Sequence, residues 1–484
     1  MTKTSIPKEI IEIAKKLEKA DFDAYLVGGC VRDVLLGRDP KDWDITTSAK
    51  PEQIQKLFPD SVYENNFGTV GVKTRSKNET LKIVEITTFR KDISYSDGRH
   101  PDKIVFAKTV EEDLARRDFT VNAMALSLKS KLVDIFGGQI DLSNKLIKAV
   151  GSPDDRFGED ALRMLRAVRF SAQLDFQIEQ KTLDSIIKNS HLLKNISKER
   201  IRDEFQKMIM TPRAAWAVQI LSNLKLLKFI IPELEEGINV GQNKHHIYTV
   251  WEHNLRALDY AVSKNYSLEI RLGSLLHDVG KPRSKSGDGP NSTFYQHEYI
   301  GATMTKKILE NLKFPKDVIN DVTLLVRCHL FYYNVGEVSA AGVRRFISRV
   351  GEEYIDDILK IREADRIGSG VPKAFPYRLR HLKFMIEKVK HDPVSPKNLK
   401  INGNDLIKKL SLKPGPRIGH ILNSLLEEII EDPKKNIKSN LEKRAKALNK
   451  LSDKELLKLR EKAEKVKEEF ETGIEAEMKK KHKV

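Results

Sequence analysis

Residues 24–44 read AYLVGGCVRDVLLGRDPKDWD, and the order of their patterns predicts a phosphate-binding turn between a strand and a helix. The apolar run at 24–27 predicts a short buried strand, and residues 31–36 predict a helical turn or two that the following glycine ends. Gly28 and Gly29 stand between them, where glycine lets the backbone approach a ligand closely. The free N–H groups at the helix start favour a phosphate as that ligand.

Two acidic residues, Asp42 and Asp44, follow this turn and flank Trp43. On an extended strand both carboxylates point to the same face. Two carboxylates beside a phosphate-binding turn suit a pair of divalent ions, here Mg²⁺, for in-line phosphoryl transfer. The alternative is a solvated loop with incidental acids, which the glycine pair upstream disfavours.

Six segments within the first 210 residues resemble, in order, the motifs of class II tRNA nucleotidyltransferases and bacterial poly(A) polymerases of the polymerase-beta-like superfamily. The resemblance implies an α+β fold, with a mixed-sheet nucleotidyltransferase head followed by helical domains. It also implies template-independent addition of CMP and AMP (CCA) to the 3′ end of tRNA from CTP and ATP. The segments are GGCVRDVLLGRDPKDWDITTSAKPEQI (28–54), EITTFR (85–90), DLARRDFTVNAMAL (113–126), VDIFGGQIDL (133–142), RFGEDALRMLRAVRF (156–170) and ERIRDEFQKMI (199–209).

Composition agrees with an RNA partner inside the cell. The formal net charge is +17, which favours a polyanion; tRNA is the implied partner, and no DNA is expected. Only two cysteines, Cys30 and Cys328, occur in 484 residues, so the sequence predicts no disulfide framework and a reducing, cytoplasmic location. No apolar run approaches the roughly 18 residues that span a bilayer, so no membrane partner is expected.

Pattern changes along the chain predict four parts. Residues 1–150 mix strands and helices as the catalytic head, and residues 151–236 form a helical neck that selects the nucleotide and binds RNA. Residues 237–370 resemble an HD domain, which many bacteria fuse to this polymerase. Residues 371–484 form a helical body and a lysine-rich tail, for which a solvated helix is the alternative to an RNA contact.

In the head, the motifs add candidates to the Asp42 and Asp44 pair. Glu85, on the strand that ends in EITTFR, is a candidate third catalytic carboxylate, and an exposed strand acid is the alternative. The resemblance places the glycine pair and three arginines at the nucleotide, whereas an arginine pair alone is often a solvated face. The predicted nucleotide-binding residues of the head are Gly28, Gly29, Arg32, Arg116 and Arg117.

In the neck, Asp160 and Arg163 lie three residues apart in a predicted helical run and so would share one face. Cytosine and adenine each present an amino donor beside a ring-nitrogen acceptor, and guanine and uracil present the reverse. A carboxylate with a guanidinium therefore accepts C and A, the role that the resemblance gives this segment. Arg166 and Arg169 would follow the triphosphate. Glu159 and Arg163 are spaced i to i+4, so we also expect a salt bridge that holds Arg163 in its rotamer. The alternative is that this pair forms only a helix salt bridge.

The HD-like region carries an H…HD…D set of candidate metal ligands that resembles metal-dependent phosphohydrolases. Imidazole and carboxylate ligands favour Mn²⁺, Ni²⁺, Co²⁺ or Mg²⁺ over structural zinc. The alternative is a module that only packs and binds RNA. The predicted ligands are His253, His277, Asp278 and Asp365, and some such domains place further histidines where His297 and His329 stand.

The sequence motifs leave related enzymes of different nucleotide specificity as alternatives. Enzymes that add only CC or only A share nearly all of these motifs, although CC-adding relatives tend to lack part of the stretch that is full length here at 90–101. A poly(A) polymerase is disfavoured because no basic element follows the first motif. A non-catalytic RNA-binding protein is disfavoured by the intact Asp42 and Asp44 pair.

Overall fold

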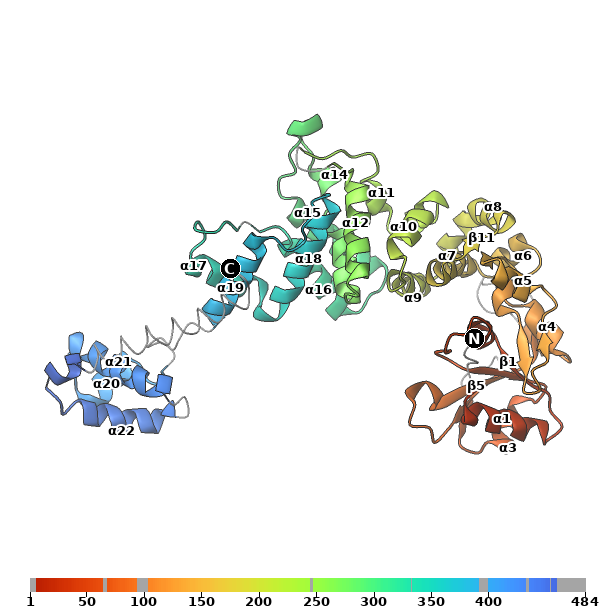
Figure 1. Cartoon of the computed structure of the whole chain (residues 1–484), viewed down its shortest axis with the longest axis horizontal. Helices are drawn as coiled ribbons and strands as arrows, with labels where there is room; N and C mark the ends of the chain where they lie inside the picture. The colour runs from red at the N-terminus through yellow and green to blue at the C-terminus, as the bar shows by residue number, and fades with distance from the viewer. Residues whose placement is uncertain are drawn as a thin grey trace. The chain divides into compact units, whose positions relative to one another are not determined.

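The computed structural model describes residues 6–63, 68–93, 103–243, 247–331, 333–390, 399–431, 435–452 and 454–458. The chain divides into two compact units (Figure 1). The first unit comprises Met1–His329 with Lys360–Pro372, and the second comprises Leu330–Leu359 with Lys373–Val484. The four-part division predicted at residues 150, 236 and 370 stays a prediction.

A mixed seven-stranded sheet forms the N-terminal part of the first unit, as the α+β class requires. β2 and β5 pair in parallel, and the other neighbours in this sheet are antiparallel. In sheet order the strands are β3 (Ser61–Tyr63), β4 (Thr69–Lys73), β5 (Ile83–Thr88), β2 (Asp44–Thr47), β1 (Ala24–Val27), β8 (Ala125–Ser127) and β9 (Leu132–Val133). The remaining short strands are β6 (Arg90–Ile93), β7 (Lys103–Phe106), β10 (Leu146–Ile147) and β11 (Gln177–Ile178).

Helices α1 and α3 cover one face of this sheet (Figure 1). α1 buries side chains at positions i, i+3, i+4 and i+7, the spacing of one helix face. Each fully buried isoleucine or leucine contributes about 1.5–3 kcal/mol, so this face fixes α1 on the sheet. The apolar spacing within residues 6–20 predicts an amphipathic helix there, and α1 confirms it. The head helices are α1 (Lys8–Glu18), α2 (Gly29–Leu35), α3 (Pro51–Leu57), α4 (Val110–Ala115) and α5 (Gly138–Ser143).

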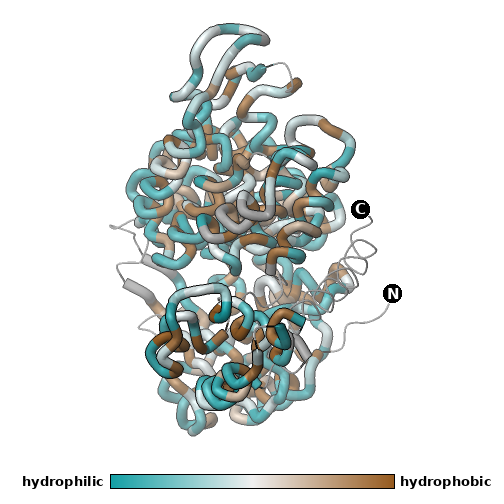
Figure 2. The backbone as a smooth tube through the Cα atoms, turned by 90° about the vertical axis from the view of Figure 1, so that its left-hand side faces the viewer, coloured by the Kyte–Doolittle hydropathy of each residue, from teal (hydrophilic) through white to brown (hydrophobic). Residues whose placement is uncertain are grey.

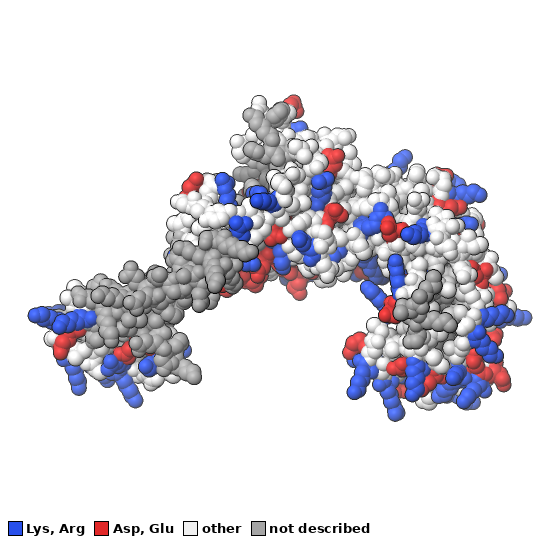
Figure 3. Space-filling view, in the orientation of Figure 1, with Lys and Arg blue, Asp and Glu red and all other residues white. Residues whose placement is uncertain are grey.

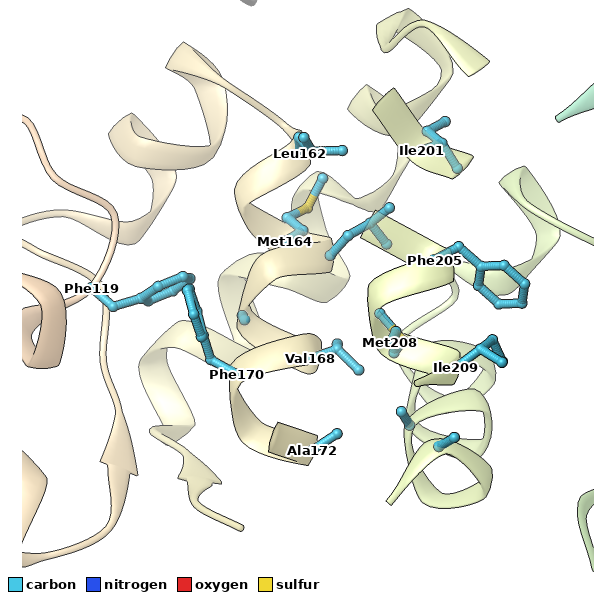
Figure 4. Close-up of a cluster of buried hydrophobic side chains, with 14 of the residues drawn as sticks. Phe119, Leu162, Met164, Val168, Phe170, Ala172, Ile201, Phe205, Met208 and Ile209 are labelled. Atoms are coloured by element: carbon cyan, nitrogen blue, oxygen red, sulfur yellow. The ribbon is translucent and has the colours of Figure 1, made fainter. Parts of the chain in front are cut away.

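The neck helices pack α7 against α9 through the apolar cluster of Figure 4. Phe170 of α7 meets Phe119 of the head edge-on, with ring centroids 5.9 Å apart, which joins neck to head. The labelled side chains of this cluster are Leu162, Met164, Val168 and Ala172 of α7 and Ile201, Phe205, Met208 and Ile209 of α9. The helices are α6 (Pro153–Glu159), α7 (Leu162–Leu174), α8 (Gln180–Asn189), α9 (Lys198–Ile209), α10 (Ala214–Asn223) and α11 (Pro232–Glu235).

The prediction of a continuous helical run through residues 160–163 is wrong at Asp160. α6 ends at Glu159 and α7 begins at Leu162, and Asp160 between them is extended at φ −149° and ψ 102°. The Asp160 carboxylate accepts a hydrogen bond from the Leu162 N–H at 3.1 Å. An aspartate side chain that bonds the local backbone competes with helix continuation, so the chain changes direction there.

The rest of the first unit is mainly helical. Figure 2 shows hydrophobic and hydrophilic residues interspersed along the described backbone. α12 packs against α10 and α13, and α16 packs against α13 and α15. Thr249 and Glu252 form a capping box that begins α12. Only the later residues of α18 belong to this unit. The helices are α12 (Val250–Ser263), α13 (Leu268–Leu276), α14 (Lys281–Ser284), α15 (His297–Asn311), α16 (Lys316–Cys328) and α18 (Ile355–Gly368).

In the second unit, α17 packs against α19, and the helices α20 to α22 share a separate apolar core. Figure 3 shows lysine and arginine interspersed with acidic side chains on the described surface, with no single basic patch on the face drawn. Among the described residues, the structure contains no helix of the length and hydropathy that crossing a membrane requires. The helices are α17 (Ala340–Val350), α19 (Tyr377–Lys390), α20 (Gly403–Leu410), α21 (Pro416–Glu431) and α22 (Lys438–Leu448).

Candidate functional site

The sheet brings two of the predicted catalytic carboxylates side by side. Asp44 is the first residue of β2 and pairs in parallel register with Glu85 of β5, so both side chains leave the same face of the sheet. Asp42 lies in the bend just before β2 and is exposed, whereas Trp43 is buried. The predicted alternation of Asp42 and Asp44 about Trp43 is therefore present, although the strand begins only at Asp44.

The negative charge of Asp44 is only partly compensated by neighbouring positive charge. Burial and the nearby Asp42 carboxylate raise the pKa of Asp44, and Arg117 opposes them only in part. Two close carboxylates repel each other, and a bound divalent cation relieves both the repulsion and the desolvation. The donor set of carboxylate oxygens therefore fits a hard cation such as Mg²⁺.

Gly28 adjoins these carboxylates in a conformation that only glycine adopts easily. Its φ is +79° and its ψ is −134°, and a Cβ there would lie 3.0 Å from Arg117 Nη1 and 3.9 Å from Asp44 Oδ2. Gly29 follows as the first residue of α2. The predicted glycine turn therefore lies directly against Asp44 and Arg117.

We expect Gly28→Ala to reduce both stability and nucleotide addition. The left-handed backbone costs a non-glycine residue about 1–3 kcal/mol, and the new Cβ displaces the Arg117 guanidinium. Gly37→Ala is the matched control, since Gly37 also has a positive φ of +68° but has no neighbouring atom within 4 Å of a Cβ. Thermal unfolding should detect a loss in both variants and a tRNA extension assay a loss only at Gly28. Equal activities would contradict a role for this close approach.

Arg116 and Arg117 are held by a carboxylate that sequence reasoning missed. Asp113 Oδ1 accepts hydrogen bonds from Arg116 Nε at 3.0 Å and Nη2 at 2.8 Å, and Asp113 Oδ2 accepts from Arg117 Nη2 at 3.4 Å. Asp113 is fully buried. Burial raises its pKa, but the two guanidinium groups hold the pKa below its usual value. The i, i+3 and i+4 spacing ahead of the arginine pair is the signal that could have identified it.

Arg32 is buried and bound to groups of the chain itself. It donates to both oxygens of Asp33, at 2.8 and 3.0 Å, and to Asn122 Oδ1 at 2.8 Å. Its guanidinium also lies 5.6 Å from the Phe170 ring centroid. Arg32 therefore ties α2 to the neck as well as lying one turn from the glycine pair.

Asp160 and Arg163 lie at the junction of α6 and α7. Asp160 Oδ2 lies 2.7 Å from Arg200 Nη2 of α9. Arg163 donates to Glu159 Oε2 at 2.5 Å, and also to the backbone carbonyl oxygens of Arg156 and Arg116 at 3.2 and 3.0 Å. The predicted Glu159–Arg163 ion pair is confirmed, and Arg163 also links neck to head through the Arg116 carbonyl.

Two further arginines of α7 pair with buried acids. Arg166 Nε donates to Asp118 Oδ2 at 2.8 Å, and Arg169 Nε donates to Glu204 Oε2 at 2.6 Å. Both guanidinium groups lie against the Phe170 ring, 5.2 and 4.1 Å from its centroid. Burial raises the pKa of Asp118, and Arg166 brings the pKa below its usual value. Asp118 and Glu204 were missed, although both stand inside the motif segments.

The predicted metal ligands of the HD-like region converge from three parts of the chain. His253 lies on α12, His277 and Asp278 follow α13, and Asp365 lies on α18. All four side chains are buried. His253 Nε2 lies 2.8 Å from His277 Nε2, 3.0 Å from Asp278 Oδ2 and 3.4 Å from Asp365 Oδ1. The sequence prediction that these four residues lie together is therefore confirmed, although a bound metal stays a prediction.

Charge is concentrated in this cluster. Burial lowers the pKa of His253. Hydrogen bonds to Asp278 and Asp365 outweigh this effect and raise the pKa to about 9. Burial would raise the pKa of Asp278, yet Lys281 and His277 hold it well below its usual range. Lys281 Nζ lies 2.6 Å from Asp278 Oδ2 and donates to Gln242 at 2.7 Å. Burial would likewise raise the pKa of Asp365, but its hydrogen bond to His253 and the charge of Arg362 hold that pKa well below its usual range.

Comparison with known proteins identifies the family. The CCA-adding enzyme of Lactobacillus helveticus is 36% identical over 433 residues, which cover 89% of this chain and 94% of that protein. The chain belongs to the CCA-adding enzyme family. Another CCA-adding enzyme, from Ligilactobacillus salivarius, is 35% identical over 425 residues, or 87% of this chain and 92% of the relative. The match extends well beyond the 210 residues that carried the sequence motifs.

Family models and a solved structure place the CCA-adding enzyme fold along the chain. The poly A polymerase head domain matches residues 24–148, a probable RNA- and SrmB-binding site of polymerase A matches 175–238, and a putative tRNA nucleotidyltransferase domain 2 matches 296–445. The Bacillus stearothermophilus CCA-adding enzyme, crystallised in complex with CTP, is 27% identical, with a TM-score of 0.60 and coverage of 92% of this chain and 97% of that one. The polymerase-beta-like head with a helical body is therefore confirmed.

Two predictions for this CCA-adding enzyme family member fall partly outside the described residues. The full-length stretch at 90–101 is described only through Ile93 in β6, and the lysine-rich tail beyond 458 is not described. The roles of the head and neck residues also stay predictions.

Proposed function

We propose that this chain adds CMP, CMP and AMP to the 3′ end of tRNA from CTP and ATP, with release of pyrophosphate. The observation that carries the proposal is the register of Asp44 with Glu85, beside Asp42 and the Gly28 turn, in a chain that matches CCA-adding enzymes over nearly their whole length. The family implies dependence on a divalent metal. We assign Mg²⁺ to the head, held by Asp42 and Asp44 with Glu85 beside them. When bound, it supplies the positive charge that neutralises the triphosphate and activates the 3′-hydroxyl.

The chain's own residues have distinct parts in this proposal. Arg117, fixed by Asp113, faces Asp44 and receives a phosphate of the nucleotide. Asp160 and Arg163 read the base, since each Asp160 oxygen has a lone pair beyond the bond it already accepts. Cys30 and Cys328 are both buried as thiols, which supports the proposed reducing, cytoplasmic location.

An extension assay tests this function and separates the related specificities. The purified chain receives tRNA lacking all three terminal residues, or tRNA ending in CC, with CTP and ATP singly and together. We expect two additions from CTP alone on the first tRNA, one from ATP alone on the second, and three with both. Arrest after two residues would indicate a CC-adding enzyme. Extension of only the second tRNA would indicate an A-adding enzyme, and synthesis of a long A tract would indicate a poly(A) polymerase.

A second function is favoured by the cluster of His253, His277, Asp278 and Asp365. Imidazole nitrogens and carboxylate oxygens meet there at 3.0–3.8 Å, which fits an HD-type divalent metal site. We propose Mn²⁺, Ni²⁺, Co²⁺ or Mg²⁺ as the ion and hydrolysis of 2′,3′-cyclic or terminal phosphates as the activity.

The HD-type activity should be separable from nucleotide addition. We expect the double variant His277→Ala, Asp278→Ala to lose metal-dependent hydrolysis of 2′,3′-cyclic and terminal phosphates while keeping CCA addition within a few-fold. Both activities are measured on the same preparations, in the presence of each of the four ions. A wild type that hydrolyses neither kind of phosphate with any of them would favour a module that only packs and binds RNA.

A further inference from the structure

A pocket in the second unit is lined by α17, by α19 and by the loop between α16 and α17 (Figure 1). Its volume is about 330 Å³, and small-molecule sites usually measure about 300–1,000 Å³. None of the residues that we assign to nucleotide addition or to the HD-type site lines it. The pocket therefore needs an occupant of its own.

Three aromatic rings line this pocket. Phe331 and Tyr333 lie in the loop before α17, and Phe346 lies on α17. The ring centroids of Phe331 and Phe346 are 5.0 Å apart, with the planes tilted by 50°. Tyr333 Oη and His381 Nδ1 are hydrogen-bonded at 2.6 Å. These contacts orient the rings, which are only half-buried, and accessible aromatic faces are the surfaces on which nucleobases stack.

The remaining lining leaves room for a flat apolar group. Gly342 is the third residue of α17, where glycine lowers helix stability relative to alanine. A Cβ at this position would lie 3.0 Å from Val338 Cγ1, so the absent side chain keeps the pocket open. Val343 and Leu382 are buried and contribute apolar side chains to the lining. An apolar space of this kind suits a planar ring system rather than an ion.

The two helices that line the pocket are basic. α17 contains three arginines and no acidic residue, and α19 contains five lysines and arginines and one glutamate. Arg349 is exposed at the pocket, with its guanidinium carbon 5.9 Å from the Phe346 ring centroid. Such an excess of positive charge favours a strand of linked phosphates over a free mononucleotide or an apolar peptide.

We propose that this pocket binds an unpaired nucleotide of the tRNA substrate. Its base stacks on Phe331 and Phe346, and its phosphate pairs with Arg349, whose planar guanidinium suits both phosphate and an aromatic face. The inference rests on the proposed function, which supplies tRNA as the strand. Stacking accepts any base because every base has a π face, so this site serves tRNAs of different sequence.

Binding of full-length wild type and variants to labelled tRNA, measured by fluorescence anisotropy at several salt concentrations, tests the site. Phe346→Leu removes one stacking face, and Val338→Trp fills the pocket without removing a ring. We expect each variant to bind tRNA about tenfold or more weakly. The dependence of affinity on salt should stay the same, because stacking releases no counterions. A blunt-ended RNA duplex, which has no unpaired base, should bind wild type and both variants equally.

Further variants separate charge from stacking. Arg349→Gln should lower the slope of log affinity against log salt by about one, as expected for one lost phosphate contact, whereas Arg349→Lys should keep the slope. Tyr377→Leu is the matched control, since Tyr377 is an exposed ring of α19 that does not line the pocket, and its tRNA affinity should be unchanged. In the extension assay, Phe346→Leu should raise KM for tRNA and leave kcat unchanged. Circular dichroism confirms that each variant is folded.

The outcomes separate the inference from the proposed function. Unchanged tRNA affinity in folded Phe346→Leu and Val338→Trp, or an equal loss of affinity for the duplex, would overturn the pocket as a base-binding site. Loss of AMP binding in Val338→Trp with tRNA affinity unchanged would assign the pocket to a free nucleotide and overturn the RNA occupant. A wild type that adds no nucleotide, yet binds tRNA in a way that both variants weaken, would overturn the proposed function and leave this inference standing.

Discussion

The double variant Asp42→Asn, Asp44→Asn is expected to add no detectable nucleotide to tRNA and yet to bind tRNA almost as tightly as the wild type. Asparagine preserves the shape of each side chain but removes the two charges that hold the metal. Loss of a single electrostatic contact to the transition state commonly costs about 10²–10³ in rate. Binding of tRNA, in contrast, rests on many lysine and arginine contacts to phosphate.

Primer extension with radiolabelled CTP measures the first part of this prediction, and fluorescence anisotropy with labelled tRNA measures the second. Asp39→Asn is the matched control, because Asp39 is an exposed acid in the same loop and should retain full activity. Appreciable incorporation by the double variant would remove the two-carboxylate assignment. A parallel loss of tRNA binding would instead place these acids in the RNA interface.

The raised pKa of Asp44 gives the single variant Asp44→Asn a stability signature of its own. A carboxyl whose pKa is raised on folding binds its proton more tightly in the folded chain, so stability falls as the pH rises from below 3.8 through the raised pKa. Asparagine cannot ionise, so the substitution removes this fall in stability. At pH 7 without divalent ions, Asp44→Asn should therefore unfold at no lower a temperature than the wild type, and adding Mg²⁺ should stabilise the head of the wild type only. A lower unfolding temperature of the variant would show that its inactivity reflects misfolding.

Local features of the head could be predicted from sequence because they depend on neighbouring residues. The glycine turn, the Asp42 and Asp44 pair and the strand carrying Glu85 follow from alternation and from the need for glycine at positive φ. The partners of the arginines could not be predicted in the same way. Asp118 meets Arg166 across 48 residues, and only the fold brings them together.

The break at Asp160 shows a different limit. Apolar residues continue at helical spacing on both sides of it, so periodicity predicts one uninterrupted helix. A single hydrogen bond from the Leu162 N–H to the Asp160 carboxylate stabilises the extended conformation instead. Similarly, motif order predicted which residues form the His253 and Asp278 cluster. Only the structure shows that the two oxygens of Asp278 face different histidines.

Asp160→Ala and Arg163→Ala should each lose nucleotide discrimination together with rate. Loss of the arginine removes the donor for the ring acceptor of C or A, and loss of the carboxylate removes the acceptor for their amino group. At roughly 1–3 kcal/mol per lost contact, preference over U and G should fall by about ten- to two-hundredfold. The measurement is incorporation of each nucleoside triphosphate, supplied alone, onto tRNA ending in CC and onto tRNA lacking all three residues.

The contacts of the junction supply controls that distinguish reading of the base from bracing of the neck. Glu159→Gln removes the charge of the Glu159–Arg163 ion pair but keeps an acceptor, so rate should fall while preference for C and A remains. Arg200→Ala frees Asp160 from its partner in α9, and its effect should likewise appear mainly in rate. If Asp160→Ala and Arg163→Ala behave like these two controls, with unchanged preference, the pair only positions α7 against the head and selection lies elsewhere. If preference for C and A is lost in Asp160→Ala and Arg163→Ala but kept in the two controls, the carboxylate and the guanidinium together act as the template.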